Sequence, residues 1–246
     1  MDELAFGNAL LRTVEPDLLE QLAPRPRVVL TTRGETLVAH AQTLENVFFP
    51  VSGLIGILAE TSDGEAVDSA LIGREGGVGM FEACGSRHFS GEAVVHVPGE
   101  AVRMTASAYR QLFDRSPNLR TAVHRYMEQC IGETRQSLLC TAVHEMDARL
   151  SRLILEALDK GRLGDTLPLT QGAMARILGA QRSTVSECLA KLERDGVLTR
   201  RRGALQIDDR GALEAEACGC RIAIRSSNDA IWRSDEPACE AVLAAE

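Results

Sequence analysis

The stretch LTQGAMARILGAQRSTVSECLAKLERDGVL, residues 169–198, decides the fold of the C-terminal part of the chain. Thr170 is of the type that caps a helix by accepting a backbone N–H. Gly179 stands where that helix must end in a left-handed conformation. Val185, Leu189 and Leu192 then recur at i, i+4 and i+7, the spacing of the buried stripe of a second helix. The stretch therefore predicts two helices joined by a tight turn.

Polar and basic side chains cover the outer face of the second predicted helix and the segment after it. GVLTRRRGALQID predicts two short strands around three arginines, a basic hairpin or wing. From residue 170 to 211, eight basic residues stand against five acidic ones, which leaves +3 in a chain of net charge −8. Such groups can contact base edges and phosphates, so we predict double-stranded DNA as a partner. The predicted DNA-binding residues are Thr170, Gln181, Arg182, Ser183, Thr184, Ser186, Glu187, Arg200, Arg201 and Arg202.

Short β-rich runs separated by turn residues fill the chain from about residue 25 to 106. Asp63-Gly64, within ETSDGEAV, is typical of a tight hairpin turn. Many short strands at this spacing predict a sandwich or a rolled barrel. Two short helical stretches, near Asn8–Val14 and Asp17–Leu22, are expected before it.

Helical periodicity replaces the strand pattern after the β-rich region. Ser107–Asp114 predicts a short helix, and Asn118–Val143 a long one. A helix of roughly 26 residues is longer than a small domain is wide, so we predict that it pairs with the same helix in a second copy of the chain. Packing against the chain's own sheet is the alternative. The residues assigned to the dimer contact are Leu119, Val123, Tyr126, Cys130 and Leu138.

The order of β-roll, long helix and winged helix-turn-helix resembles the cyclic-AMP receptor / fumarate-nitrate regulator (Crp/Fnr) superfamily of bacterial transcription factors. Residues 169–198 and the pattern VFFPVSGLIGIL…DGEAVDSALIGREGGVG carry the resemblance, which spans roughly residues 25–212. It implies an α+β fold: an N-terminal β-roll sensor domain like a cyclic-nucleotide-binding jelly roll (1–116), a dimerisation helix (117–144) and a winged helix-turn-helix domain with a C-terminal tail (145–246). It further implies a homodimeric regulator on a pseudo-palindromic operator, with RNA polymerase as another partner.

The resemblance also assigns roles within the second helix. Arg182 matches the family's arginine that reads a guanine, a role suited to its bidentate guanidinium. Ser183 stands where many members have a glutamate, and Glu187 where many have an arginine. These two departures indicate an operator that differs from the familiar one.

The glycine-rich stretch IGREGGVGMF, residues 72–81, falls in the sensor part. Cyclic-nucleotide-binding members use a Gly-Glu-Leu segment and a later arginine to hold ribose and phosphate. Gly77-Val78-Gly79 aligns with that segment and Gly91 with the arginine, so both charged anchors are missing and cAMP is disfavoured. The glycines are then expected to serve strand turns. The candidate effector pocket comprises Gly76, Gly77, Val78, Gly79 and Arg87, with Arg87 as a substitute phosphate partner or, alternatively, a solvated loop residue.

The seven cysteines do not form the pattern of a secreted disulfide framework, because their number is odd and their spacing irregular. Cys130, Cys140 and Cys188 are expected to pack as small hydrophobes. The first cysteine is Cys84, which disfavours an N-terminal iron–sulfur cluster, and no histidine spacing singles out a haem ligand. Cys218 and Cys220 are separated by one residue, which is closer than in a usual zinc motif, and Cys239 follows further on; we therefore predict no metal site. A thiol switch at Cys218 and Cys220 stays open as an alternative, and the sequence does not identify a cofactor.

Composition and motifs exclude other classes of protein. An apolar content of 45% with 25% charged residues is that of an ordinary globular chain, and VFFPVSGLIGILA is too short to cross a bilayer. The N-terminal residues do not resemble a signal peptide, so we expect a cytoplasmic protein without a membrane partner. The sequence has neither the lysine of a phosphate-binding loop nor a set of nucleophile and base, so we do not predict an enzyme. A dimeric interaction module whose winged helix does not bind DNA, and an effector-independent regulator, remain alternatives. LEAEACGCRIAIR is expected to close the winged domain with a helix.

Overall fold

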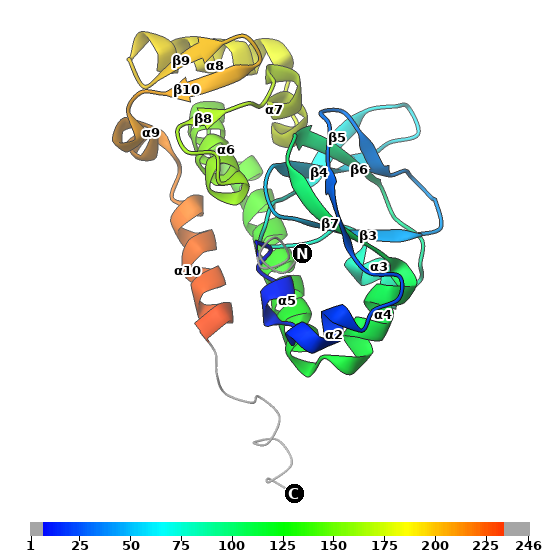
Figure 1. Ribbon diagram of the computed structural model, residues 1–246. Helices are drawn as coiled ribbons and strands as arrows, with labels where there is room; N and C mark the ends of the chain where they lie inside the picture. The colour runs from blue at the N-terminus through cyan, green and yellow to red at the C-terminus, as the bar shows by residue number, and fades with distance from the viewer. Residues whose placement is uncertain (1–6, 234–246) are drawn as a thin grey trace, which may run out of the picture.

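The computed structural model describes residues 7–233, and it arranges them as a β-roll, a long central helix and a C-terminal unit of helices around a small sheet (Figure 1). The N-terminal segment forms a short 3₁₀ helix, η1 (Leu11–Thr13), and helix α2 (Pro16–Glu20). These are shorter versions of the two helical stretches that the sequence predicts.

Two antiparallel sheets form the β-roll. One has the strand order β1 (Arg27–Leu30), β7 (Glu100–Thr105), β3 (Asn46–Pro50). The other has the order β2 (Thr36–Val38), β6 (Glu92–Val97), β4 (Leu54–Glu60), β5 (Ala66–Ile72). Large apolar side chains such as Phe49 and Leu44 fill the space between the sheets. The predicted rolled barrel of short strands is confirmed.

A helix that the sequence analysis did not predict follows the glycine-rich stretch. Gly79 adopts a left-handed conformation (φ 80°) and begins α3 (Met80–Cys84). A Cβ at Gly79 would press on Leu44, so both the conformation and the space favour glycine here. The expectation that all these glycines serve strand turns was therefore incomplete, because one of them starts a helix.

Helices α4 (Ala106–Arg115) and α5 (Pro117–Val143) connect the roll to the C-terminal unit. Hydroxyl caps from Thr105 and Ser116 start them, and Pro117 occupies the first turn of α5. One face of α5 completes the core of the roll. Four of the five residues predicted for the dimer contact lie on that face: Leu119, Val123 and Tyr126 are buried, and Cys130 packs against them. For these four the dimer prediction is wrong, and the alternative of packing within the chain applies; Leu138 is 73% exposed.

The C-terminal unit contains a second hydrophobic core, with Leu150, Ile154 and Leu189 at its centre. Its helices are α6 (Met146–Gly161), α7 (Gln171–Leu178), α8 (Arg182–Arg194) and α9 (Arg210–Glu216). Its sheet has the order β8 (Thr166–Leu167), β10 (Ala204–Ile207), β9 (Leu198–Arg201). The two predicted helices and the wing are therefore present, with β8 as an additional strand.

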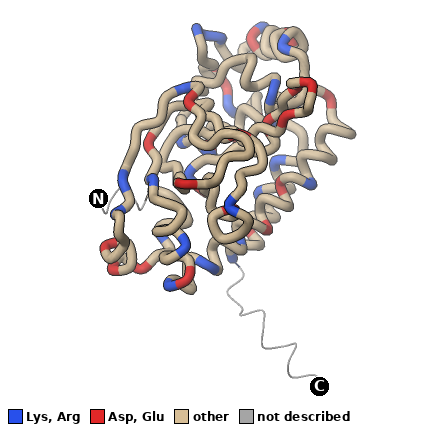
Figure 2. Tube along the Cα trace, turned by 90° about the vertical axis from the view of Figure 1, so that its right-hand side faces the viewer, with Lys and Arg blue, Asp and Glu red and all other residues tan. Residues whose placement is uncertain are grey.

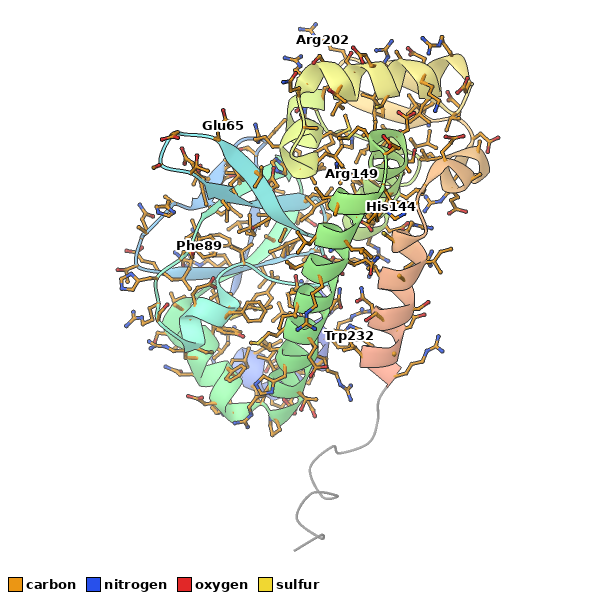
Figure 3. The ribbon with its side chains drawn as sticks, turned by 180° about the vertical axis from the view of Figure 1, so that it is seen from behind. Glu65, Phe89, His144, Arg149, Arg202 and Trp232 are labelled. Carbon is orange, nitrogen blue, oxygen red and sulfur yellow. The ribbon has the colours of Figure 1, made fainter. Side chains whose placement is uncertain are left out.

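The last described helix, α10 (Cys220–Arg233), turns back and lies along α5, on the side away from the β-roll (Figures 1 and 3). Trp232 Nε1 donates to Gln129 Oε1 at 2.8 Å, and Asn228 Nδ2 donates to Glu133 Oε1 at 3.0 Å. The predicted closing segment packs on the winged unit, because Leu213 of α9 is buried in its core and Arg221 at the start of α10 pairs with Asp159 of α6 and Glu214 of α9. The rest of α10 was not predicted to leave this unit and pack along α5. Among the described residues, no helix is long and apolar enough to cross a membrane.

Candidate nucleic-acid interface and internal cavity

The helix-turn-helix has the local interactions that its sequence predicts. Thr170 Oγ1 accepts the backbone N–H of Ala173 at 3.1 Å and caps α7. Gly179 ends α7 in the left-handed conformation, with φ 59°. Val185 and Leu189 are fully buried and fix α8 on α7 and α6. These contacts leave the opposite face of α8 in solvent.

The predicted base-reading residues lie at the start of α8 and on its outer face, at the edge of the molecule farthest from α2 (Figure 1). Gln181, Arg182, Ser183 and Glu187 are exposed, whereas Thr184 and Ser186 are half-buried. Arg182 is the first residue of α8, where the positive end of the helix dipole also favours an anion. The structure therefore brings these six residues together on one surface.

The wing extends beside α8 and carries the three consecutive arginines. Arg201 and Arg202 are exposed and have no ion pair within the described residues, and Arg202 points away from the body of the protein (Figure 3). Arg200 differs, because its guanidinium lies 2.6 Å from the carboxylate of Glu193 on α8. Hydrogen bonds from Arg200 lower the pKa of Glu193 below its usual value. Arg200 thus joins the wing to α8, and its two neighbours are free to meet phosphate.

An excess of basic side chains is found locally, on α8 and the wing, and not over the protein as a whole. Figure 2 shows basic and acidic positions interspersed over most of the trace, in keeping with the net charge of −8. A polyanion would therefore be attracted by the particular arginines of α8 and the wing and not by the protein as a whole.

Direct contacts join the β-roll to the helix-turn-helix. Helix α7 packs on β5, where Arg176 Nε lies 3.8 Å from Asp68 Oδ2. The other oxygen of Asp68 lies 2.7 Å from Nε2 of His96, a buried neighbour on β6. Gly56 makes this pair possible, because a Cβ there would collide with both side chains. A displacement of β5 in the roll would thus act directly on α7, the first helix of the DNA-binding motif.

A cavity of about 290 Å³ lies between the four-stranded sheet, α3, α5 and α6. Gly77, Val78 and Gly79 line it, as predicted for an effector pocket. Val78 is held by two backbone hydrogen bonds with Phe48, and its side chain is buried. The volume is at the lower end of the range for small-molecule sites.

The other two predicted pocket residues do not line this cavity. Gly76 packs against the phenol of Tyr126, which fills the space beside it. Arg87 is an exposed loop residue with φ 63°, so of the two alternatives for it the solvated loop residue applies and the substitute phosphate partner does not. Gly91, which aligns with the family's phosphate-binding arginine, has φ 111° and lies against the Leu58 carbonyl oxygen. This backbone therefore leaves no room for a side chain at residue 91.

The charged side chains of the cavity are largely engaged with one another. Four carboxylates and three cations line it: Asp68, Glu82, Glu133, Glu156, Arg149, Arg152 and Lys160. Arg152 donates to both carboxylate oxygens of Glu156, and Lys160 Nζ lies 2.9 Å from Glu133 and 3.2 Å from Glu75. Arg149 donates to the Leu178 carbonyl at 2.6 Å. Lys160 and Arg152 are thus committed to carboxylates, whereas Arg149 has no carboxylate partner within the described residues and its Nε has no hydrogen-bond partner there.

The titration of these groups follows from burial and pairing. Burial tends to lower the pKa of Lys160, but Glu75 and Glu133 outweigh it and raise the pKa above its usual value. Burial raises the pKa of Glu82 and that of Glu156, the latter against the opposing effect of Arg152. An anionic ligand would add negative charge to a lining that already carries one carboxylate more than it has cations.

Sequence reasoning missed a cluster of thiols and one imidazole at the end of α5. Cys140, expected to pack as a small hydrophobe, meets His144, Cys218 and Cys220, and the potential ligand atoms all lie within 4.8 Å of one another. The signal available in the sequence was the spacing of Cys140 and His144, one helical turn apart, together with the Cys218-Gly-Cys220 pair. Cys239, the third cysteine of the predicted tail group, lies outside the described residues.

Comparison with known proteins identifies the C-terminal unit. Residues 148–216 match the family model of the Crp-like helix-turn-helix domain. A CRP-like cAMP-activated global transcriptional regulator of Mycobacterium tuberculosis is 24% identical over 226 residues, which cover 88% of this chain and 100% of the relative. The aligned region therefore includes both the roll and the helix-turn-helix.

Solved structures have the same fold. FixK2 from Bradyrhizobium japonicum has a TM-score of 0.67 at 15% identity, over 78% of this chain and 98% of that one. CLP from Xanthomonas campestris, a c-di-GMP responsive global regulator, has a TM-score of 0.62 at 17% identity, over 78% and 99%. Residues 148–216 thus form a Crp-like helix-turn-helix domain, and the β-roll and long helix before it complete the architecture of the Crp/Fnr superfamily of transcription regulators.

Proposed function

We propose that the protein is a homodimeric, sequence-specific transcription regulator that binds a pseudo-palindromic DNA site and whose sensor domain does not take cAMP in the family's usual way. The observation that carries the proposal is the surface of α8 and the wing, where Arg182, Arg201 and Arg202 are exposed and have no ion pair within the described residues. From the family we infer that RNA polymerase is a further partner and that the protein acts in the cytoplasm.

Each DNA-binding residue has a distinct proposed role. Arg182 reads a guanine through O6 and N7, and Glu187, five residues further along α8 and also exposed, accepts from a cytosine amine. Thr170, Gln181, Ser183, Thr184 and Ser186 complete the contact surface at phosphates or base edges. Arg201 and Arg202 follow the phosphate backbone, with Arg200 holding the wing in place through Glu193. The operator then differs from the family's familiar one at the positions that Ser183 and Glu187 face.

The proposal of a homodimer rests on the face of α5 that the roll leaves open. Met127, Ile131, Thr134 and Leu138 are exposed there. Their spacings of four, three and four residues are those of a coiled-coil seam, and a second copy of α5 would bury them. The partners of α10 on α5, such as Gln129 and Glu133, lie on another face of the helix, so α10 leaves this stripe uncovered.

The sensor proposal rests on the charges of the internal cavity. The relative from Mycobacterium tuberculosis is described as cAMP-activated, but here Val78 and Gly91 stand where the charged anchors would be. Lys160 and Arg152 are already paired with carboxylates, so a cyclic phosphate would have to break an ion pair to reach either of them. Arg149 has no carboxylate partner within the described residues, but it donates to the Leu178 carbonyl. An uncharged or cationic small molecule suits this lining better, and an effector-independent regulator is the alternative.

Selection from a random duplex DNA library tests the proposal. We expect enrichment of a pseudo-palindrome with half-sites about 10 base pairs apart, since two recognition helices of a dimer meet DNA one turn apart. The double variant Ile131→Glu, Leu138→Glu should be monomeric in analytical ultracentrifugation and should lose the selected site, whereas Ile222→Glu on the exposed face of α10 serves as the control. Binding that is neither sequence-selective nor salt-dependent would favour the interaction module instead.

A further inference from the structure

The thiol cluster at the end of α5 has the composition of a metal site. Cys140 and His144 lie one turn apart at the C-terminal end of the helix. Cys218 lies in the turn between α9 and α10, and Cys220 is the first residue of α10. Cys140 Sγ lies 3.5 Å from Cys218 Sγ, and Cys220 Sγ lies 3.5 Å from His144 Nδ1. The three cysteines are buried and His144 is half-buried. Three thiols and one imidazole are one of the ligand sets of structural zinc sites.

The distances distinguish a single ion from a cluster. With Zn–S bonds of about 2.3 Å, tetrahedral geometry sets the ligand atoms about 3.8 Å from one another. All four atoms lie within 4.8 Å of one another, and two pairs lie at 3.5 Å. An iron–sulfur cluster places inorganic sulfide and several irons between its cysteines and needs a wider cage. The arrangement therefore fits one tetrahedral ion.

The surroundings of the four ligands also suit a metal–thiolate group. Gln136 Nε2 donates to Cys220 Sγ at 3.1 Å, the kind of outer hydrogen bond that orients and stabilises a ligating thiolate. Arg152 is buried close enough to act electrostatically on both Cys140 and Cys218, and its Nε has no hydrogen-bond partner within the described residues. A divalent ion with three thiolates carries a charge of about −1, and this guanidinium would offset it.

The backbone already holds the ligands in place. The His144 N–H donates to the Cys140 carbonyl at 3.1 Å, and the Cys218 N–H donates to the Ala148 carbonyl at 3.3 Å. Figure 3 shows His144 at the end of α5 beside the start of α10, with Trp232 near the other end of the same helix pair. The cluster therefore joins the end of α5, the start of α6 and the turn before α10.

We propose that Cys140, His144, Cys218 and Cys220 bind one Zn²⁺ ion as a structural site that fastens α10 and the helix-turn-helix unit to the end of α5. The site lies where α5 meets the DNA-binding unit, so its occupancy sets how firmly the two are joined. The inference does not depend on the proposed function, because metal binding is measured without DNA.

The full-length protein, purified under reducing conditions without chelators, provides the first test. We expect one equivalent of zinc per chain by mass spectrometric metal analysis. Protein stripped of metal should bind one equivalent of Co²⁺ with the visible absorption bands of tetrahedral cobalt and a thiolate-to-metal charge-transfer band. These measurements on the unaltered chain remain decisive even if a variant fails to fold.

Variants test the ligand set. Cys218→Ser and Cys220→Ser should lose the cobalt charge-transfer intensity or the metal itself, and Gln136→Ala should bind Co²⁺ roughly tenfold more weakly because its outer hydrogen bond is gone. Cys84→Ser, which removes an exposed thiol outside the cluster, is the matched control and should bind as the unaltered chain does. Zinc-free protein that binds no Co²⁺ in the reduced state would overturn the proposal. So would iron and sulfide at the site, or unchanged cobalt spectra in both cysteine variants.

Discussion

The charged side chains of the winged unit and those of the internal cavity are arranged in opposite ways. On α8 and the wing, Arg182, Arg201 and Arg202 are exposed and have no ion pair within the described residues. In the cavity, Lys160 is held between Glu75 and Glu133, and Arg152 is held by Glu156. The three arginines of the first region can bind an anion without losing an ion pair, whereas Lys160 and Arg152 in the second would each have to give one up.

This difference separates cations that stabilise the fold from cations that are available for binding. A buried ion pair is costly to break, because the remaining charge stays in a medium of low polarity. An exposed arginine is solvated and contributes little to stability, but its full charge is available to a partner. The contrast predicts that substitutions in the two regions affect different measurements.

The largest effect is expected for Lys160→Met. This change leaves Glu75 and Glu133 facing each other without their cation, and the side chain of Lys160 is only 20% exposed. We expect the free energy of unfolding to fall by about 3 kcal/mol, measured by urea denaturation. The matched control is Lys191→Met, which breaks a more exposed pair with Asp147 and should have a much smaller effect. Equal losses in the two variants would show that burial of the cavity pair does not matter.

The next effect concerns sequence-specific binding. Arg182→Ala should weaken binding to the selected operator by about 1–3 kcal/mol and relax the preference at one base pair of each half-site. Fluorescence anisotropy with the operator and with single-base variants measures both quantities. Thermal stability should be unchanged, because Arg182 is exposed and has no ion pair within the described residues. If the variant discriminates bases as the unaltered protein does, Arg182 does not read DNA.

The wing should affect all DNA sequences alike. Arg201→Gln and Arg202→Gln are each expected to lower the slope of log affinity against log salt concentration by about 1 for every phosphate contact removed. Arg200→Gln is the informative comparison, because it also breaks the pair with Glu193 that joins the wing to α8. A change in base preference without a change in salt dependence would argue against phosphate contacts by the wing.

The smallest effect is a dependence of stability on pH. Burial raises the pKa of Glu133, but Lys160, Asn228 and Gln129 lower it more, so that it lies below its usual 4.5 in the folded state. Its contribution is therefore complete above pH 4.5 and is lost as the pH falls through the lower, folded-state pKa. Glu133→Gln should reduce the loss of stability between pH 5 and 3, measured by denaturant unfolding, by about 1 kcal/mol at most. An unchanged acid profile would contradict this pairing.

Local signals in the sequence predicted most of the fold. Thr170 caps α7 and Gly179 ends it in the left-handed conformation, because both roles depend on a few neighbouring residues. The strands of the roll were equally visible from their turns. Helix α3 was missed because the glycines before it suggested turns only, although the conformation of Gly79 starts the helix.

Contacts between distant segments could not be read from periodicity. The positions Leu119 to Cys130 and the positions Met127 to Leu138 both recur at helical spacing, and the pattern does not say which face meets the roll. Four of the five residues predicted for the dimer contact belong to the first set, which the roll covers, and only Leu138 belongs to the second. The cluster of Cys140 with Cys218 and Cys220 was hidden for the same reason, because α10 first has to return along α5.

The most direct test of the account compares operator binding with and without cAMP. The full-length protein and its selected operator are titrated at fixed salt, first alone and then with saturating cAMP, and the DNA dissociation constant is measured by fluorescence anisotropy. We expect salt-dependent, sequence-specific binding with the same dissociation constant in both titrations. A dissociation constant that falls when cAMP is added would contradict the proposal for the cavity, and the absence of sequence-specific binding in both titrations would contradict the proposal for α8 and the wing.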